Sequence, residues 1–228
     1  MRGAVQTGIR QIEVRDVPEP PPVEGMALVR VRAAGICGSD LHPYHGRPEP
    51  QPLPEGHEVS GEVIDLPPDY HGPIRSGDRV AMDTICLGRA CGTCAFCLAG
   101  QPFHCAERRA GPYPGGGFAE VIRRRPAGLF RLPDGVTFEQ GALIEPFAVA
   151  VHAVRYARMP AGASVAVIGA GTIGQMTLLA ARAFGAGPIH VLARHAHQAT
   201  LAAELGATTV ARAGDDEAVE QIRVLTGG

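Results

Sequence analysis

Two patterns of apolar and polar residues divide the chain. In the first two thirds, short apolar runs alternate with turns rich in Gly, Pro and Asp, as at 27–33, 58–64 and 78–82. Runs of this kind are typical of β-strands in a sandwich or barrel-like domain. The proline-rich stretches 18–22 and 48–54 are expected to be loops, because proline has no N–H to donate to a sheet.

The pattern changes near Ala161, where short apolar runs begin to alternate with stretches of helical period. A helix at 145–156 is expected to link the two regimes. The expected strands are 164–168, 189–192 and 208–210, and the expected helices are 172–184, 198–205 and 215–225. An alternation of strand and helix is one half of a doubly wound sheet.

The sequence therefore predicts a mixed α/β protein with two domains. A β-rich domain is expected at residues 1–155, and a partial dinucleotide-binding domain at 156–228. The sequence ends at Gly228, after three of the roughly six strands that such a sheet usually has. We therefore expect either a fragment or a partner that covers the open edge.

Composition narrows the function classes. The 228 residues are 45% hydrophobic and 5% aromatic, with no Trp and a net charge of −2. These values argue against a polyanion binder and a base-stacking platform. The most apolar stretch, 164–186, is broken by four glycines, a Gln and an Arg, so no membrane anchor is expected. The N-terminus lacks an apolar signal region, which predicts a cytoplasmic protein.

Four of the six cysteines form a dense cluster, Cys91, Cys94, Cys97 and Cys105. Two-residue gaps let neighbouring thiolates converge on one ion, and four thiolates complete a tetrahedral zinc shell with no open position. This predicts a structural zinc. An iron–sulfur cluster and four unrelated thiols remain alternatives. Cys86 lies outside the spacing and is expected to be a packed free thiol.

A nucleic-acid zinc finger is disfavoured, because no basic helix follows the cluster. Arg108, Arg109 and residues 123–125 are interpreted instead as a solvated face.

A second set of metal-ligand types is Cys37, His57 and Glu58. One thiolate, one imidazole and one carboxylate would leave a coordination position open for water or substrate, as a catalytic zinc requires. From the residues alone, a core cysteine and an ordinary loop histidine remain alternatives.

Residues 169–174 read Gly-x-Gly-x-x-Gly, after an apolar run and before a helical stretch. Gly169 permits the tight turn, Gly171 lets the backbone approach a pyrophosphate, and Gly174 lets helix and strand pack closely. With Thr172 and Ile173, these glycines open a helix whose free N–H groups attract phosphates. The motif predicts a dinucleotide site.

The end of the next strand bears on the choice of nucleotide. NAD-binding proteins usually carry Asp or Glu there, about twenty residues past the glycines, to hold the ribose hydroxyl. This chain has Ala193 followed by Arg194. A guanidinium can pair with a 2′-phosphate, so NADP is predicted over NAD. Arg194 could also stack on adenine or face solvent.

Five motifs together resemble zinc-dependent medium-chain alcohol and polyol dehydrogenases. They are Cys37-Gly-Ser-Asp40, Gly56-His57-Glu58, Gly77-Asp-Arg-Val80, the cysteine quartet and Gly169–Gly174, in the family's order over the whole chain. The resemblance implies a GroES-like catalytic domain followed by a Rossmann domain. It also implies two zinc ions per subunit and hydride transfer between an alcohol or polyol and NADP or NAD.

By the same resemblance, Cys37 and His57 look like catalytic zinc ligands, with Glu58 as the adjacent carboxylate. Residues 142–146 read Ala-Leu-Ile-Glu-Pro, which resembles the polyol and sorbitol branch of the family. By that resemblance, Glu145 would take the last ligand position, directly or through water. Glu145 could instead cap the following helix.

The other positions implied by the resemblance surround this zinc. Asp40 would orient the imidazole of His57. Ser39 resembles the hydroxyl that bonds the substrate alcohol, and His42 resembles an outer proton relay; both could be ordinary polar residues. The resemblance also implies that the full-length protein is a homo-oligomer, a dimer or a tetramer. The rival interpretation is an inactive fragment or a structural zinc-binding protein.

Overall fold

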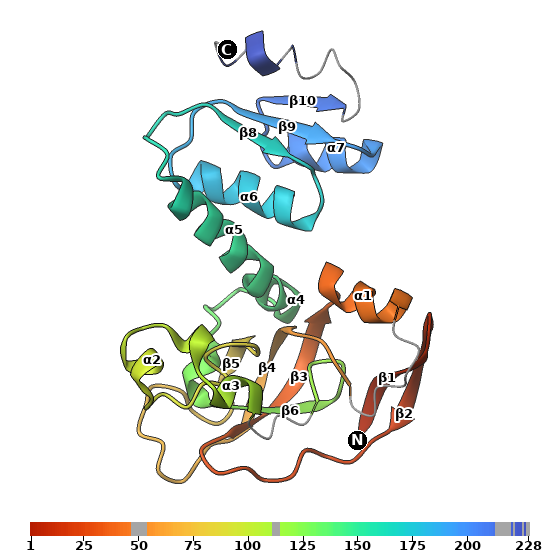
Figure 1. The fold of residues 1–228 in the computed structure, drawn as a ribbon, viewed down its shortest axis with the longest axis vertical. Coiled ribbons are helices and arrows are strands. Elements are labelled where there is room, and N and C mark those ends of the chain that lie inside the picture. Colours follow the sequence, from red (N-terminus) through yellow and green to blue (C-terminus); the bar gives the residue numbers. More distant parts are fainter. Residues whose placement is uncertain (47–53, 111–114, 213–219, 221, 225, 227–228) are drawn as a thin grey trace. The chain divides into compact units, whose positions relative to one another are not determined.

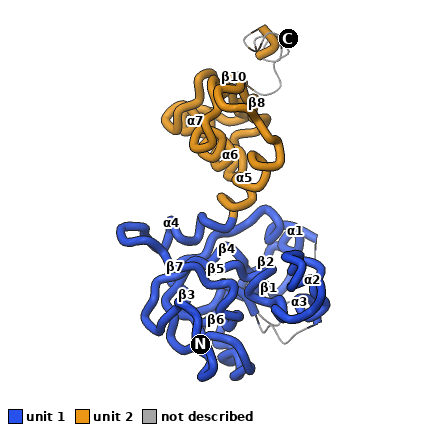
Figure 2. Tube along the Cα trace, turned by 90° about the vertical axis from the view of Figure 1, so that its left-hand side faces the viewer, with its two compact units in different colours: residues 1–145 blue, residues 146–228 orange. Residues whose placement is uncertain are grey.

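The computed structural model describes residues 1–46, 54–110, 115–212, 220, 222–224 and 226. The chain forms two compact units, Met1–Glu145 and Pro146–Gly228, coloured blue and orange in Figure 2. This division falls at the start of helix α5 (Ile144–Ala157), about ten residues before the boundary predicted at residue 155. Ala150 and Val154 of α5 belong to the core of the second unit. The loop expected at 48–54 and the helix expected at 215–225 lie largely outside the described residues.

An antiparallel sheet of five strands forms the centre of the first unit, in the order β6-β3-β4-β5-β7 (Figure 1). The strands are β3 (Ala27–Gly35), β4 (Glu58–Asp65), β5 (Arg79–Asp83), β6 (Val121–Arg124) and β7 (Leu129–Arg131). Their apolar side chains, among them Val29, Val63 and Val80, form one buried cluster. The strands predicted from the alternating pattern are confirmed. A separate hairpin joins β1 (Arg2–Gly8) and β2 (Gln11–Asp16).

Short helices complete the first unit. Helix α1 (Gly38–Gly46) follows β3, and α2 (Ala95–Leu98), η1 (Pro102–His104), α3 (Glu107–Ala110) and η2 (Pro126–Gly128) lie between β5 and β7 in the sequence. Helix α4 (Phe138–Ala142) begins with a capping box between Thr137 and Gln140. It packs on β3, β4 and β5, so closely that a Cβ at Gly141 would lie 2.9 Å from the Cβ of Ser60.

The second unit is a parallel sheet of three strands in the order β10-β9-β8. The strands are β8 (Val165–Ile168), β9 (Ile189–Ala193) and β10 (Thr209–Arg212), joined through helices α6 (Thr172–Ala183) and α7 (Ala196–Glu204). Val167 and Val191 pack with Leu178 and Ala202 of these helices in one core. The predicted strand–helix alternation and the mixed α/β class are confirmed. Among the described residues, none of the helices combines the length and apolar character needed to cross a bilayer.

The carboxylate of Asp78 stabilises the turn that leads into β5. Its carboxylate accepts hydrogen bonds from the backbone N–H of Arg75 at 2.7 Å and from the Arg131 guanidinium at 2.8 Å. Burial raises the pKa of Asp78, but the hydrogen bonds from Arg131 and Arg75 and the positive charge of both arginines together hold it below its ordinary value. Asp78 therefore stabilises the fold in its ionised form.

We expect Asp78→Asn to lower the free energy of unfolding at pH 7 by about 1 kcal/mol, because the pair is partly exposed and screened by solvent. A carboxyl with a depressed folded pKa contributes its full stability above its unfolded pKa, and that contribution is lost as the pH falls through the folded pKa. The difference between wild type and variant should therefore shrink in acid. Urea unfolding at several pH values measures it. Asp134→Asn, in an exposed turn, is the control, and an equal effect there would contradict the assignment.

Candidate metal centres and nucleotide site

The structure brings Cys37, His57 and Glu58 together. One ligand atom from each side chain lies within 4.8 Å of the other two. Cys37 directly precedes α1, whereas His57 and Glu58 stand where β4 begins. Tetrahedral bonds of the usual zinc lengths separate ligand atoms by about 3.3–3.8 Å, so small side-chain movements would close this group around one ion. The donor set and its spacing fit a zinc ion.

Asp40 contacts two of these residues. Its Oδ2 accepts the backbone N–H of Cys37 at 2.8 Å, and its Oδ1 lies 3.5 Å from Nδ1 of His57. In the first contact, a carboxylate in the first turn of α1 accepts a hydrogen bond from the backbone N–H of the residue that precedes the helix. The second leaves Nε2 as the imidazole nitrogen available to a metal.

Glu58 is buried, with 6% of its surface exposed. Burial and the charge of Asp40 raise its pKa above the ordinary value, against the opposing effects of His57 and Cys37. Its partner across the ladder is Gly35, where any Cβ would collide with Oε2 of Glu58. A glycine at the end of β3 thus makes the space that this carboxylate occupies.

Glu145 stands in the first turn of α5 and is not part of the compact group of three. Burial raises its pKa, and the charges that act on it are those of His57, Glu58, Asp83 and Asp40. Its carboxylate therefore lies in the electrostatic surroundings of the same group. Ser39 and His42 are both exposed on α1, two and five residues after Cys37.

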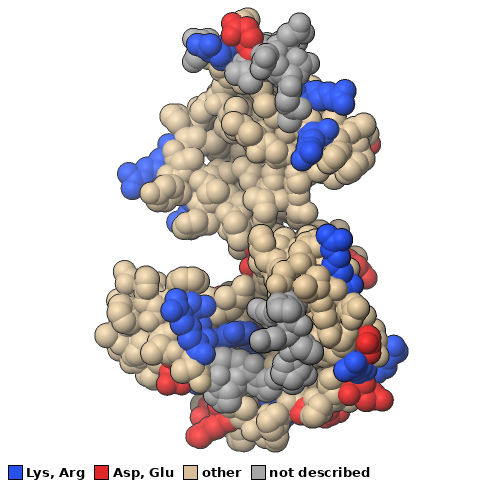
Figure 3. Space-filling view, turned by 45° about the vertical axis from the view of Figure 1, so that its right-hand side comes forward, with Lys and Arg blue, Asp and Glu red and all other residues tan. Residues whose placement is uncertain are grey.

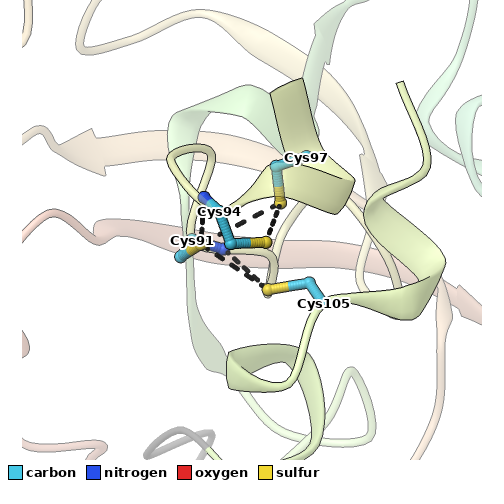
Figure 4. A group of neighbouring side chains, drawn as sticks. All are labelled: Cys91, Cys94, Cys97 and Cys105. Atoms are coloured by element: carbon cyan, nitrogen blue, oxygen red, sulfur yellow. Dashed lines mark hydrogen bonds between the residues drawn. The ribbon is translucent and has the colours of Figure 1, made fainter. Parts of the chain in front are cut away.

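Four sulfur atoms converge in the second cluster (Figure 4). Cys94 and Cys97 lie at the start of α2 and within it, and Cys105 directly follows η1. The Sγ atoms of Cys91 and Cys97 are 3.9 Å apart, those of Cys94 and Cys97 3.5 Å, and those of Cys91 and Cys105 3.6 Å. Tetrahedral zinc–sulfur bonds of about 2.3 Å would place sulfurs about 3.8 Å apart. The quartet fits a closed tetrahedral site.

Hydrogen bonds favour a thiolate at Cys91. The Thr93 hydroxyl and the backbone N–H groups of Thr93 and Cys94 lower the pKa of Cys91 to about 6. Burial, together with the neighbouring thiols of the quartet, raises the pKa of Cys97. Burial and the nearby charges of Asp83 and Cys105 raise the pKa of Cys86. It is a free, partly buried thiol beside the quartet, as its place outside the spacing predicts.

The interpretation of the nearby arginines as a solvated face is wrong for two of them. Arg108 is 9% exposed, donates from Nε to the carbonyl of Phe103 at 3.0 Å and covers that ring at 4.1 Å. Arg124 is fully buried among backbone carbonyls. Arginine can be buried when acceptors meet its N–H groups, and these acceptors come from the fold. Basic and acidic side chains both occur on the face drawn in Figure 3.

The glycine motif forms the turn between β8 and α6. Gly169 has φ of 102°, a conformation that favours glycine, and a Cβ at Gly174 would collide with the carbonyl oxygen of Gly169. Gly171 is the N-cap of α6, and Thr172 and Ile173 form its first turn. The N–H groups of this turn are the free donors that a phosphate requires.

Gln175 holds this turn, and Arg194 directly follows the neighbouring strand β9. Gln175 is 6% exposed, and its amide donates to the carbonyls of Ala170 at 3.2 Å and Gln198 at 2.9 Å, which ties the turn to α7. Arg194 follows β9 and is exposed, beside the N-cap residue of α7, His195. The rings of His195 and His197 stack with centroids 5.7 Å apart.

Sequence reasoning missed the roles of Gly35 and Gln175, whose contacts are with residues that the fold brings near them. The pairing of Gly35 with Glu58 could have been found only from the register of β3 and β4. The position of Gln175 directly after the last motif glycine was the one available signal.

Comparisons with known proteins agree with this geometry. Residues 23–134 match the alcohol dehydrogenase GroES-like domain. Sorbitol dehydrogenase of Bacillus subtilis is 35% identical over 99% of this chain and 65% of its own length. (R,R)-butanediol dehydrogenase of the same species is 34% identical over 100% of this chain and 68% of its own.

A solved structure gives the same result. Galactitol-1-phosphate dehydrogenase of Escherichia coli superposes with a TM-score of 0.83 at 30% identity, over 100% of this chain and 65% of that one. The chain thus spans about two thirds of the length of these relatives. The chain belongs to the zinc-dependent medium-chain alcohol and polyol dehydrogenase family, with a GroES-like domain followed by part of a Rossmann domain.

Proposed function

We propose that this chain is part of a zinc-dependent oxidoreductase that transfers hydride between an alcohol or polyol and NADP or NAD. The observation that carries the proposal is the convergence of Cys37, His57 and Glu58 in a unit separate from the glycine-rich turn. Three protein ligands leave a zinc ion with an open position, which suits a substrate oxygen. The four cysteines of the quartet would complete the shell of their own ion, so the group of Cys37, His57 and Glu58 is the one that could bind a substrate.

In the proposed site, Cys37, His57 and Glu58 would hold the catalytic zinc. Glu145 would be the last ligand, directly or through a water that the substrate oxygen could replace. A bound zinc would supply a Lewis acid for the alcohol oxygen, and a bound nicotinamide would accept the hydride. The quartet Cys91, Cys94, Cys97 and Cys105 would hold a second, structural zinc.

The chain's own residues would bind and relay the proton. Asp40 holds the backbone of Cys37 and faces Nδ1 of His57. Ser39 would accept the hydroxyl proton of the alcohol while it donates its own hydroxyl proton to the exposed His42, which would release a proton to solvent. Both lie on α1, three residues apart and therefore on one side of the helix, which begins directly after Cys37.

Turnover of an alcohol panel by the full-length subunit tests the proposal. Sorbitol, a vicinal diol, a simple secondary alcohol and threonine should be offered with each nucleotide. We expect oxidation of at least one, with activity lost after chelation and restored by zinc. If none is oxidised by the zinc-loaded subunit, the rival interpretation holds, that of a scaffold fastened by its structural zinc.

The proposal extends to the nucleotide. The first turn of α6, with Gly169, Gly171 and Gly174, would take the pyrophosphate. Arg194 would pair with the 2′-phosphate of NADP, because Ala193 offers no carboxylate to hold a free ribose hydroxyl. Assembly into a dimer or tetramer and a cytoplasmic location stay predictions.

We expect Arg194→Ala to raise the KM for NADP by about 10-fold to 100-fold, the value of a lost charge-assisted hydrogen bond, and to leave the KM for NAD nearly unchanged. Steady-state kinetics with both nucleotides measure the split. Arg158→Ala, at an exposed position of the same unit, is the control. A wild-type preference for NAD, or equal effects on both nucleotides, would contradict the role given to Arg194.

A further inference from the structure

The carbonyl of His57 accepts a hydrogen bond from a side chain that directly follows the neighbouring strand, β5. Thr84 is 1% exposed, and its hydroxyl donates to this carbonyl at 3.0 Å. Glu58 and Asp83 are the paired residues at this end of β4 and β5. The Thr84 hydroxyl therefore supplies a hydrogen bond to His57 one residue beyond the ladder.

Thr84 is held in turn by Arg124. The guanidinium is 0% exposed, and its Nε donates to the carbonyl of Thr84 at 3.0 Å. Its Nη2 donates to the carbonyl of Gly115 at 3.0 Å. Each bond to a buried guanidinium is difficult to replace, because an unpaired donor there would carry the full penalty of desolvation. Arg124 thus joins the segment after β5 to the segment before β6.

The segment before β6 holds the residues that precede His57. The N–H of Gly117 donates to the carbonyl of Gly56 at 2.9 Å, and the N–H of Phe118 donates to that of Glu55 at 2.8 Å. Gly56 has φ of 96°, and a Cβ there would lie 2.8 Å from the ring of Phe118. Arg124 therefore bonds to Thr84, which donates to the carbonyl of His57, and to Gly115, whose segment bonds to the residues before His57.

We propose that Thr84 and Arg124 are positioning residues that fix the peptide of His57, so that its imidazole meets the zinc held with Cys37. This inference rests on the proposed function. Asp40 orients the ring at Nδ1, but the position of the ring also depends on where its backbone is held. Residues that orient metal ligands from outside contribute about 10-fold to 100-fold in metal affinity.

The test is the zinc affinity of Thr84→Val, which keeps the shape of threonine and removes the hydroxyl. Chelator competition on the full chain should show two zinc ions in the wild type, one of them absent from Cys37→Ser. In Thr84→Val, the dissociation constant of that second ion should rise about 10-fold, with the quartet ion unchanged. Thr84→Ser should restore wild-type affinity.

Ser60→Ala is the matched control. Ser60 is a buried hydroxyl on β4, two residues from Glu58, and it donates to the carbonyl of Phe138 at 2.5 Å rather than to the backbone of a metal ligand. It should lower the free energy of unfolding without weakening zinc binding. Unchanged zinc affinity in Thr84→Val, or equal weakening in Ser60→Ala, would overturn the inference alone. A wild-type chain that holds only the quartet ion would overturn the proposed function and this inference together.

Discussion

Cys37→Ser should lower kcat/KM for alcohol oxidation by the full-length subunit by at least about 10³-fold, because loss of the zinc removes several kcal/mol of stabilisation of developing charge. The zinc content should fall from two ions to one per subunit. Serine has nearly the shape of cysteine, and Cys37 is only partly buried, so the fold should remain. Steady-state kinetics, metal analysis and circular dichroism measure the three effects.

Cys86→Ser is the control for this substitution. Cys86 is also a free, partly buried thiol of the same unit, but it belongs to neither group of ligands. It should keep both zinc ions and wild-type turnover. Near-normal turnover in Cys37→Ser would show that this thiol does not hold a catalytic metal.

Cys94→Ser should have the opposite profile, with a large loss of stability and a retained catalytic zinc. The segment that carries the quartet, residues 91–105, has little apolar core. Helices α2 and η1 contain no buried residue, and the large apolar side chains of Phe96, Leu98 and Phe103 are exposed. Metal ligation therefore replaces a hydrophobic core here. Structural zinc sites contribute directly to folding, and we expect a loss of about 3 kcal/mol or more.

Limited proteolysis and zinc analysis test this second substitution. Cleavage should move into residues 91–105, and one zinc ion should remain. Cys86→Ser, a few residues away along the chain, should show neither change. Wild-type stability and zinc content in Cys94→Ser would mean that the quartet is a set of ordinary thiols.

Local pattern was sufficient for much of the fold. Alternating and continuous apolar runs located β3, β4, β5, β8 and β9, because a strand's burial repeats every two residues or is uniform. The quartet could also be predicted from spacing, since its four sulfurs come from fifteen consecutive residues. These features depend on neighbours in sequence.

The other centre could not be predicted from local pattern. Cys37 and His57 are brought together by the antiparallel pairing of β3 and β4, and only resemblance to a family suggested that they meet. The burial of Arg124 depends on carbonyls of Thr84 and Gly115, which composition cannot reveal. Three arginines in a row indicate a solvated surface unless the fold supplies such acceptors.

Anomalous diffraction at the zinc absorption edge, from crystals of the zinc-loaded chain, tests the central claim most directly. The account predicts two peaks. One should lie about 2.3 Å from each quartet sulfur, and the other about 2.3 Å from the sulfur of Cys37 and about 2.0 Å from Nε2 of His57. A single peak at the quartet, with those two side chains sharing no ion, would contradict it.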